Sequence, residues 1–161
     1  MQYDRASADH ALRIRNAIPA DASAIQTLYR ELVPDDDRIH ILPTRLKQIA
    51  EDPNTLLLVA YADGSILATA SVTFCIDAMY QEQPFGLIEN VIVTAAARLK
   101  GVGRTLMEAI NAVALERDCS KLMLLSHAQR LAAHDFFSKC GFDGTSKRGF
   151  VKYRRAFKTD P

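Results

Sequence analysis

A basic turn with two glycines, Arg98 to Arg104 (RLKGVGR), is the feature that most constrains the fold of this chain. It follows an apolar run rich in Val and Ile, Leu87 to Thr94, which has the composition of a β-strand. It precedes a segment extending to about Arg117 in which apolar residues recur at helical spacing. The three pieces together predict a strand, a tight turn and an amphipathic helix.

The turn has the chemistry of an anion-binding site. Gly101 and Gly103 allow the backbone to approach a ligand closely, because they carry no Cβ. Free N–H groups at a helix start bind phosphate, helped by the helix dipole. Arg98, Lys100 and Arg104 add positive charge at the same place, so the turn predicts a pyrophosphate site.

Three kinds of nucleotide site compete for this turn. A P-loop requires GxxxxGK followed by Ser or Thr, and the spacing here is different. A dinucleotide-binding fold requires GxGxxG, but Leu106 occupies the position of the third glycine and the supporting βαβ repeats are missing. The third interpretation is a loop that holds the pyrophosphate of coenzyme A.

The remaining patterns predict a single domain of mixed α and β structure over residues 11–161, preceded by a flexible leader at residues 1–10. Asp21 is expected to cap a first helix whose apolar stripe includes Ile25 and Leu28. Asp63-Gly64 predicts a hairpin turn, and Gly141 a helix end. The other expected elements are strands at 12–15, 55–61, 65–76, 121–125 and 150–153, and helices at 44–50 and 129–140.

Composition excludes several classes of protein. The 161 residues carry 20 Lys and Arg against 19 Asp and Glu, a net charge of +1, which disfavours a dedicated nucleic-acid binder. No apolar run approaches the roughly 18 residues of a membrane span, and residues 1–16 lack the apolar centre of a secretory signal. Three widely spaced cysteines indicate reduced thiols in a cytoplasmic protein. The four histidines form no cluster with metal-ligand spacing, so no metal is expected.

The segment from Gly86 to Phe142 resembles the GNAT superfamily of acetyl-CoA-dependent N-acetyltransferases. Its phosphate signature is Gln or Arg, two residues, Gly, one residue, then Gly or Ala, and Arg98 to Gly103 matches every fixed position. The ending Ala133 to Phe142 is similar to the family's second signature, Ala-x-x-Phe-Tyr-x-x-x-Gly-Phe. The resemblance implies an α+β fold with a central, mostly antiparallel twisted sheet flanked by helices.

The resemblance also implies where acetyl-CoA would bind. Backbone groups of the strand near Ile92 would bond the pantetheine arm, because this strand splays from its neighbour, and N–H groups from Lys100 to Thr105 would hold the pyrophosphate. Arg130 stands where many members carry an Asn that contacts coenzyme A. The residues assigned to the coenzyme are Val91, Ile92, Val93, Arg98, Leu99, Lys100, Gly101, Val102, Gly103, Arg104, Thr105, Arg130, His134 and Phe137.

Catalysis of acyl transfer to an amine needs a base, since a free alkyl amine has a pKa of about 10.4. Glu89 is the leading catalytic residue, because family members often place a Glu on this strand beside the thioester. Phe137 departs from the family pattern, in which a Tyr protonates the leaving thiolate. A thiol pKa of around 8.5 makes unassisted departure tolerable near neutral pH.

The acceptor is expected to be a small-molecule amine or a peptide amine, and Glu89, Asn90, Tyr80 and His127 are expected to face it. The predicted activity is transfer of an acetyl group from acetyl-CoA to a primary amine by direct attack in a ternary complex. The alternative is a non-catalytic acyl-CoA-binding sensor or partner domain on the same fold, which Phe137 would explain. No nucleic-acid or membrane partner is expected, and a homodimer is compatible with the resemblance.

Overall fold

The computed structural model describes residues 3–4 and 11–157 of the chain. Its contacts divide the chain into two compact units, Met1–Leu124 and Leu125–Pro161. The leader expected at residues 1–10 lies outside the described residues except for Tyr3–Asp4, which forms a short strand, β1. The expectation of one domain over residues 11–161 stays a prediction.

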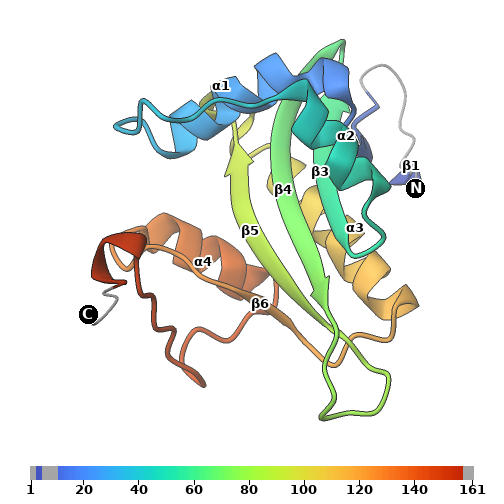
Figure 1. Cartoon of the computed structure of the whole chain (residues 1–161). Helices are drawn as coiled ribbons and strands as arrows, with labels where there is room; N and C mark the ends of the chain where they lie inside the picture. Colours follow the sequence, from blue (N-terminus) through green and yellow to red (C-terminus); the bar gives the residue numbers. More distant parts are fainter. Residues whose placement is uncertain (1–2, 5–10, 158–161) are drawn as a thin grey trace. The chain divides into compact units, whose positions relative to one another are not determined.

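In the described part of the first unit, six strands form one sheet in the order β1-β2-β3-β4-β5-β6 (Figure 1). Neighbouring strands are antiparallel except β5 and β6, which are parallel. The expected α+β fold with a mostly antiparallel sheet is therefore confirmed. The strands are β2 (Arg13–Asn16), β3 (Thr55–Ala62), β4 (Ser65–Cys75), β5 (Phe85–Val93) and β6 (Leu122–Leu124).

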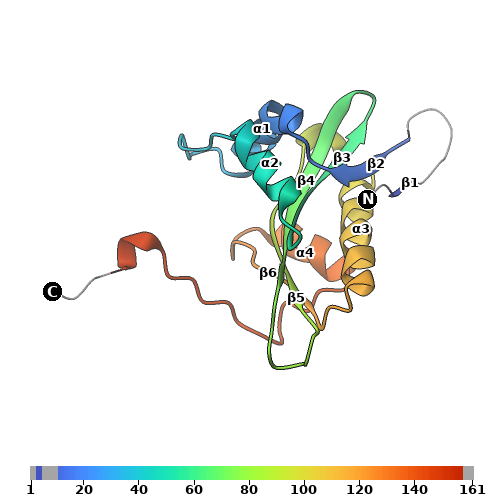
Figure 2. The ribbon, with the colours of Figure 1, turned by 45° about the vertical axis from the view of Figure 1, so that its right-hand side comes forward.

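Three helices of this unit cover the sheet on both faces. Figure 2 shows α1 (Ala22–Leu32) and α2 (Pro43–Glu51) on one side and α3 (Val102–Glu116) on the other. The parallel pairing of β5 with β6 requires a crossover, and α3 provides it. The helices and the strands over 12–15, 55–76 and 121–125 are thus confirmed, with boundaries shifted by one or two residues.

Each face of the sheet has its own apolar core. Under α1 and α2, the buried residues Ala17, Ala22, Ile25, Leu46, Leu57 and Val59 pack together. On the other face, α3 buries Val102, Leu106, Met107, Ala109, Ile110, Val113 and Ala114 at spacings of three and four. The hairpin between β3 and β4 turns at Asp63 and Gly64, whose φ angles of 51° and 75° are those of a type I′ turn.

The second unit contains α4 (Leu131–Lys139), a short 3₁₀ turn at Arg154–Ala156 and extended chain. Gly141 follows α4 with a φ of 90°, as expected of a helix C-terminus. The strand expected at residues 150–153 is wrong: these residues form no strand, and the Phe150 side chain is 88% exposed. Alternation of apolar and basic side chains predicts a strand only where a sheet edge is available to pair with it.

The expected role of Asp21 also needs correction. Its side chain makes no capping bond to α1. Instead its carboxylate accepts two hydrogen bonds from the Arg15 guanidinium, at 2.7 and 3.0 Å, and one from the N–H of Ile18 at 2.8 Å. Burial raises the pKa of Asp21, but these hydrogen bonds outweigh burial and leave the pKa below its ordinary value. Asp21 therefore fixes the end of β2 to the start of α1.

We predict that Asp21→Ala lowers the free energy of unfolding by about 2 kcal/mol, since it leaves half-buried donors of Arg15 and Ile18 without their acceptor. Because the folded pKa is depressed, the contribution of Asp21 is present at neutral pH. It is lost as the pH falls below the ordinary Asp value through the folded one. Urea titrations at pH 7 and pH 3 measure both effects.

The matched control is Asp36→Ala, which removes an exposed ion pair with Arg38. We expect no measurable change in the denaturation midpoint for this variant. A midpoint for Asp21→Ala equal to that of the control would contradict the structural role given to Asp21.

Candidate active site

The candidate site begins where β5 loses one of its two neighbours. β6 pairs with β5 only from Gly86 to Ile88, opposite Leu122 to Leu124 (Figure 1). Beyond Ile88, β5 continues to Val93, and no strand in the described ranges pairs with it on that side. The polar backbone groups of that edge are thus available to a ligand. This divergence was expected from the family resemblance, while a bond from Ile92 or Val93 to the pantetheine arm stays a prediction.

A β-bulge lies at the same place on the opposite edge of β5. Thr69 pairs with Ile92 and Ser71 pairs with Glu89, so Ala70 alone opposes both Asn90 and Val91. Asn90 has a φ of 54°, a left-handed conformation that Asn tolerates better than most residues. The bulge interrupts the alternation of the strand and leaves two successive polar side chains, Glu89 and Asn90, exposed. Glu89 and Asn90, two of the residues expected to face the acceptor, are therefore both exposed at this point of β5.

The loop after β5 has the form of an anion-binding turn. A 3₁₀ turn, Ala95–Ala97, leads to Leu99 and Gly101, with φ angles of 61° and 82°. Gly101 is the N-cap of α3, and the first backbone bond of the helix runs from the Thr105 N–H to the Gly101 carbonyl at 3.0 Å. The preceding N–H groups, of Val102, Gly103 and Arg104, are thus outside the helical ladder. Three donors at a positive helix end suit a pyrophosphate.

The basic side chains of the loop are not all directed to a ligand. Arg98 donates from Nη2 to Glu31 Oε1 at 2.8 Å and from Nε to the Val93 carbonyl at 3.1 Å. Arg104 is paired with Glu108 at 3.3 Å along α3. Lys100 is exposed. The guanidinium of Arg98 is thus bound to protein acceptors, and its role at the phosphate stays a prediction.

Two residues of α1 near the site were not found from the sequence. Glu31 reaches the loop through Arg98, although 67 positions separate them. Tyr29 packs its ring on the core cluster under α1 and α2. Burial, with a smaller contribution from the charge of Glu89, raises the pKa of Tyr29 to about 12. A tyrosine on the apolar stripe of a helix was the only signal in the sequence, and it is indistinguishable from ordinary core packing.

The remaining predicted residues belong to the β4–β5 loop and to the second unit. Tyr80 is exposed, at 49%, in the loop between β4 and β5. The second unit contains His127, Arg130, His134 and Phe137, and their approach to the coenzyme stays a prediction. Within that unit, the His134 ring lies 3.1 Å from the His127 carbonyl through Nε2. The Phe137 ring contacts Phe136 and Phe142, with centroids 5.2 and 6.1 Å away.

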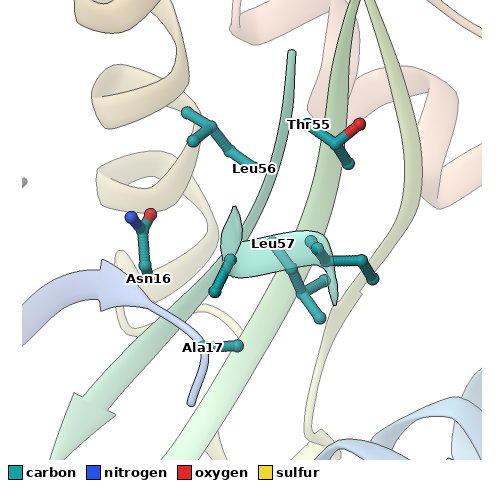
Figure 3. A pocket seen from close by; sticks show the side chains of 7 residues that line it. Asn16, Ala17, Thr55, Leu56 and Leu57 are labelled. Atoms are coloured by element: carbon teal, nitrogen blue, oxygen red, sulfur yellow. The ribbon is translucent and has the colours of Figure 1, made fainter. Parts of the chain in front are cut away.

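Other kinds of site find little support in the described ranges. No group of three His, Cys, Asp or Glu residues there is placed to hold a metal ion. No helix there is long and apolar enough to cross a bilayer. Figure 3 shows a small hollow between the end of β2, the start of β3 and α2, lined by Asn16, Ala17, Ile49, Ala50 and residues 55–57. It contains none of the predicted site residues and is too small for a coenzyme.

Comparison with known proteins defines the class of protein. The model of the acetyltransferase (GNAT) family matches residues 22–142, about three quarters of the chain. The chain therefore belongs to the GNAT family of acetyltransferases. It is an N-acetyltransferase, and membership of this family implies acetyl-CoA as the acetyl donor.

The chain is also similar to individual acetyltransferases. The chain is similar to the aminoglycoside N(6′)-acetyltransferase type 1 of Stenotrophomonas maltophilia, with 31% identity over 137 residues, 83% of this chain and 88% of that protein. A putative acetyltransferase from Agrobacterium tumefaciens has a similar structure, with a TM-score of 0.77, 30% identity, and coverage of 88% of this chain and 99% of the other. AAC(6′)-Iy, solved with a bisubstrate analogue of CoA and acetylneamine, shares the fold at a TM-score of 0.73 and 19% identity, over 89% of this chain and 98% of its own.

We predict that Gly101→Ala raises the Kd for acetyl-CoA about tenfold, because a Cβ disfavours the left-handed φ that aims the loop donors. Nothing lies within 4 Å of the added Cβ, so backbone conformation and not crowding within the protein is responsible. Calorimetric titration with acetyl-CoA measures the change.

Gly64→Ala is the matched control, since Gly64 has a φ of 75° and equally open surroundings in the distant β3–β4 hairpin. Both variants are expected to lose a similar amount of stability, about 1 kcal/mol. Equal acetyl-CoA affinities of the two variants would contradict the assignment of residues 98–105 to the phosphate.

We further predict that Tyr29 ionises near pH 12, above the ordinary tyrosine value of about 10. Tyrosinate absorbance, measured for the wild type and for Tyr29→Phe, identifies the residue. Glu89→Gln should lower the pKa of Tyr29 while leaving it above the ordinary value, because burial is the larger cause. An unchanged titration in Glu89→Gln would contradict the proximity of the two side chains.

Proposed function

We propose that this enzyme acetylates a primary amine of an aminoglycoside-type small molecule, by direct attack on acetyl-CoA, with Glu89 as the general base. The observation that carries the proposal is the exposure of Glu89 at the point where β5 loses β6. A thioester laid along the open edge of β5 would have this carboxylate beside it. The similarity to an aminoglycoside N(6′)-acetyltransferase supports the class of acceptor.

In the proposed reaction the amine nitrogen attacks the carbonyl carbon of the thioester. An N–C bond forms, the C–S bond breaks, and coenzyme A leaves as the thiolate. Glu89, directly or through a water molecule, accepts the proton that the amine loses. Backbone N–H groups of β5 would polarise the carbonyl, as an oxyanion hole does. Phe137 has no proton to donate, so the thiolate leaves without a general acid at that position.

Charge near the site suits a cationic acceptor. Glu89 is exposed on β5, and the run Asp35-Asp36-Asp37 follows α1, which packs against β5. Within this run Asp36 is bound to Arg38 at 2.6 Å, so Asp35 and Asp37 carry its remaining charge. An acidic surface attracts polyamines from solution and accelerates their association.

The cytoplasmic location expected from the thiols stays a prediction.

The acceptor is tested with a pair of aminoglycosides that differ at one position. Neomycin B carries an amine at the 6′ carbon, and paromomycin carries a hydroxyl in its place. Thiol release from acetyl-CoA is expected with neomycin B and not with paromomycin. Equal turnover of both would contradict the 6′ amine as the acceptor, while turnover of lysine peptides alone would contradict the small-molecule class. Binding of acetyl-CoA without turnover on any amine would favour the sensor function.

For the catalytic role, Glu89→Gln is expected to lower kcat by ~10²-fold, since the variant cannot accept the amine proton. Its Kd for acetyl-CoA should stay unchanged. Glu51→Gln on α2, whose wild-type carboxylate lies 3.9 Å from Lys47, is the matched control and should keep the wild-type rate. A wild-type kcat for Glu89→Gln on the true acceptor would remove Glu89 from the mechanism.

A further inference from the structure

We infer that Glu31, at the end of α1, is a positioning residue for the pyrophosphate loop. The inference rests on the proposed role of residues 98–105 in binding coenzyme A. Glu31 lies far from this loop in the sequence and is not one of the residues expected to bind the phosphate. Its carboxylate holds the start of the loop in place, so it affects the coenzyme through the loop and not by contact.

A single carboxylate oxygen joins two parts of the loop. Glu31 Oε1 accepts the Ala95 N–H at 2.7 Å and Arg98 Nη2 at 2.8 Å. Arg98 in turn donates from Nε to the Val93 carbonyl at 3.1 Å. These three bonds link the end of α1, the last residue of β5 and both ends of the 3₁₀ turn at Ala95–Ala97. We call this set of residues, Glu31, Val93, Ala95 and Arg98, the loop clamp.

The loop between β5 and α3 needs support from another element, because its own side chains make few hydrogen bonds or packing contacts that would fix its conformation. The 3₁₀ turn consists of three alanines, and the Thr94 side chain makes no capping bond to it. Glu31 therefore caps the Ala95 N–H from another element. Leu99 has a left-handed φ of 61° and a fully exposed side chain, so its backbone is strained and packing of the side chain does not compensate for the strain. A strained loop persists only where its surroundings hold it.

The exposure of the clamp separates its effect on binding from its effect on folding. The Arg98 and Glu31 side chains are 52% and 30% exposed, and ion pairs of this kind add little to global stability. The bonds nevertheless determine which loop conformation is populated. If the competent loop falls to about a tenth of the population, the apparent Kd of its ligand rises about tenfold. Loss of the clamp should thus appear in the affinity for acetyl-CoA and hardly in the melting temperature.

The clamp also assigns a different role to Arg98. The phosphate signature alone suggests that this guanidinium contacts the pyrophosphate. In the structure it is bound to Glu31 and to the Val93 carbonyl, so it acts by shaping the loop. An Arg98 that acts only through the clamp has its effect abolished once Glu31 is gone. This difference makes the two roles of Arg98 separable by a double-mutant cycle.

The test is calorimetric titration of the full chain with acetyl-CoA, for the wild type and for Glu31→Ala, Glu31→Gln and Glu51→Gln. Glu31→Ala is expected to raise the Kd about tenfold. Glu31→Gln keeps an oxygen acceptor for both donors but loses the charge, so its Kd should lie between those of Glu31→Ala and the wild type. Glu51→Gln should bind as the wild type does. Melting temperatures of all variants should agree within a few degrees.

The outcomes distinguish the clamp from the site on which it rests. A wild type that does not bind acetyl-CoA overturns the proposed site. A wild type that binds, with Glu31→Ala and Glu31→Gln within twofold of it, overturns the clamp alone. In the cycle, Glu31→Ala with Arg98→Ala should bind no more weakly than Glu31→Ala by itself, because Arg98 has no acceptor on α1 once Glu31 is gone. Additive losses would overturn the indirect role of Arg98 and favour its direct contact with phosphate.

Discussion

β5 is hydrogen-bonded to β4 along most of its length but to β6 over three residue pairs only. The candidate site depends on this difference. Parallel strands need a crossover between them, and here α3 follows β5 after the loop of residues 94–101 and returns the chain to β6. The start of α3, with its unpaired N–H groups, is thereby placed at the same end of the sheet as the open edge of β5. Topology thus places a helix start, whose first N–H groups lie outside the helical ladder, at the same end of the sheet as a strand edge whose backbone groups pair with no strand in the described ranges.

The last turns of α1 carry two residues that act on the candidate site. Tyr29 packs into the core under α1 and lies close enough to Glu89 for that charge to act on its hydroxyl. Glu31, two residues later, bonds the loop that leads from β5 to α3. A single helix therefore lies near the proposed base and is bonded to the proposed coenzyme loop.

Patterns of neighbouring residues predicted most of the helices, strands and turns, because the conformational preferences of short segments largely determine these elements. The Asp63-Gly64 turn, the stripe of α1 and the glycine after α4 each follow from conformational preferences of a few neighbouring residues. Two expectations failed because they depended on distant partners. The segment at 150–153 alternates like a strand but pairs with no strand in the described ranges, and Asp21 takes Arg15 as its partner instead of the helix start. The bulge at Asn90 was not predicted, since a bulge depends on the pairing of two strands.

The sequence by itself determined the class of chemistry. Arg98 to Gly103 between a strand and a helix, followed by the second signature ending at Phe142, is enough to identify the acetyltransferase family, because a turn that binds pyrophosphate requires glycine at specific positions. Only the tertiary structure decided what holds that turn in place. The bond between Glu31 and Arg98 spans 67 positions, and no local preference encodes a contact between side chains that meet only after the sheet and α1 have packed.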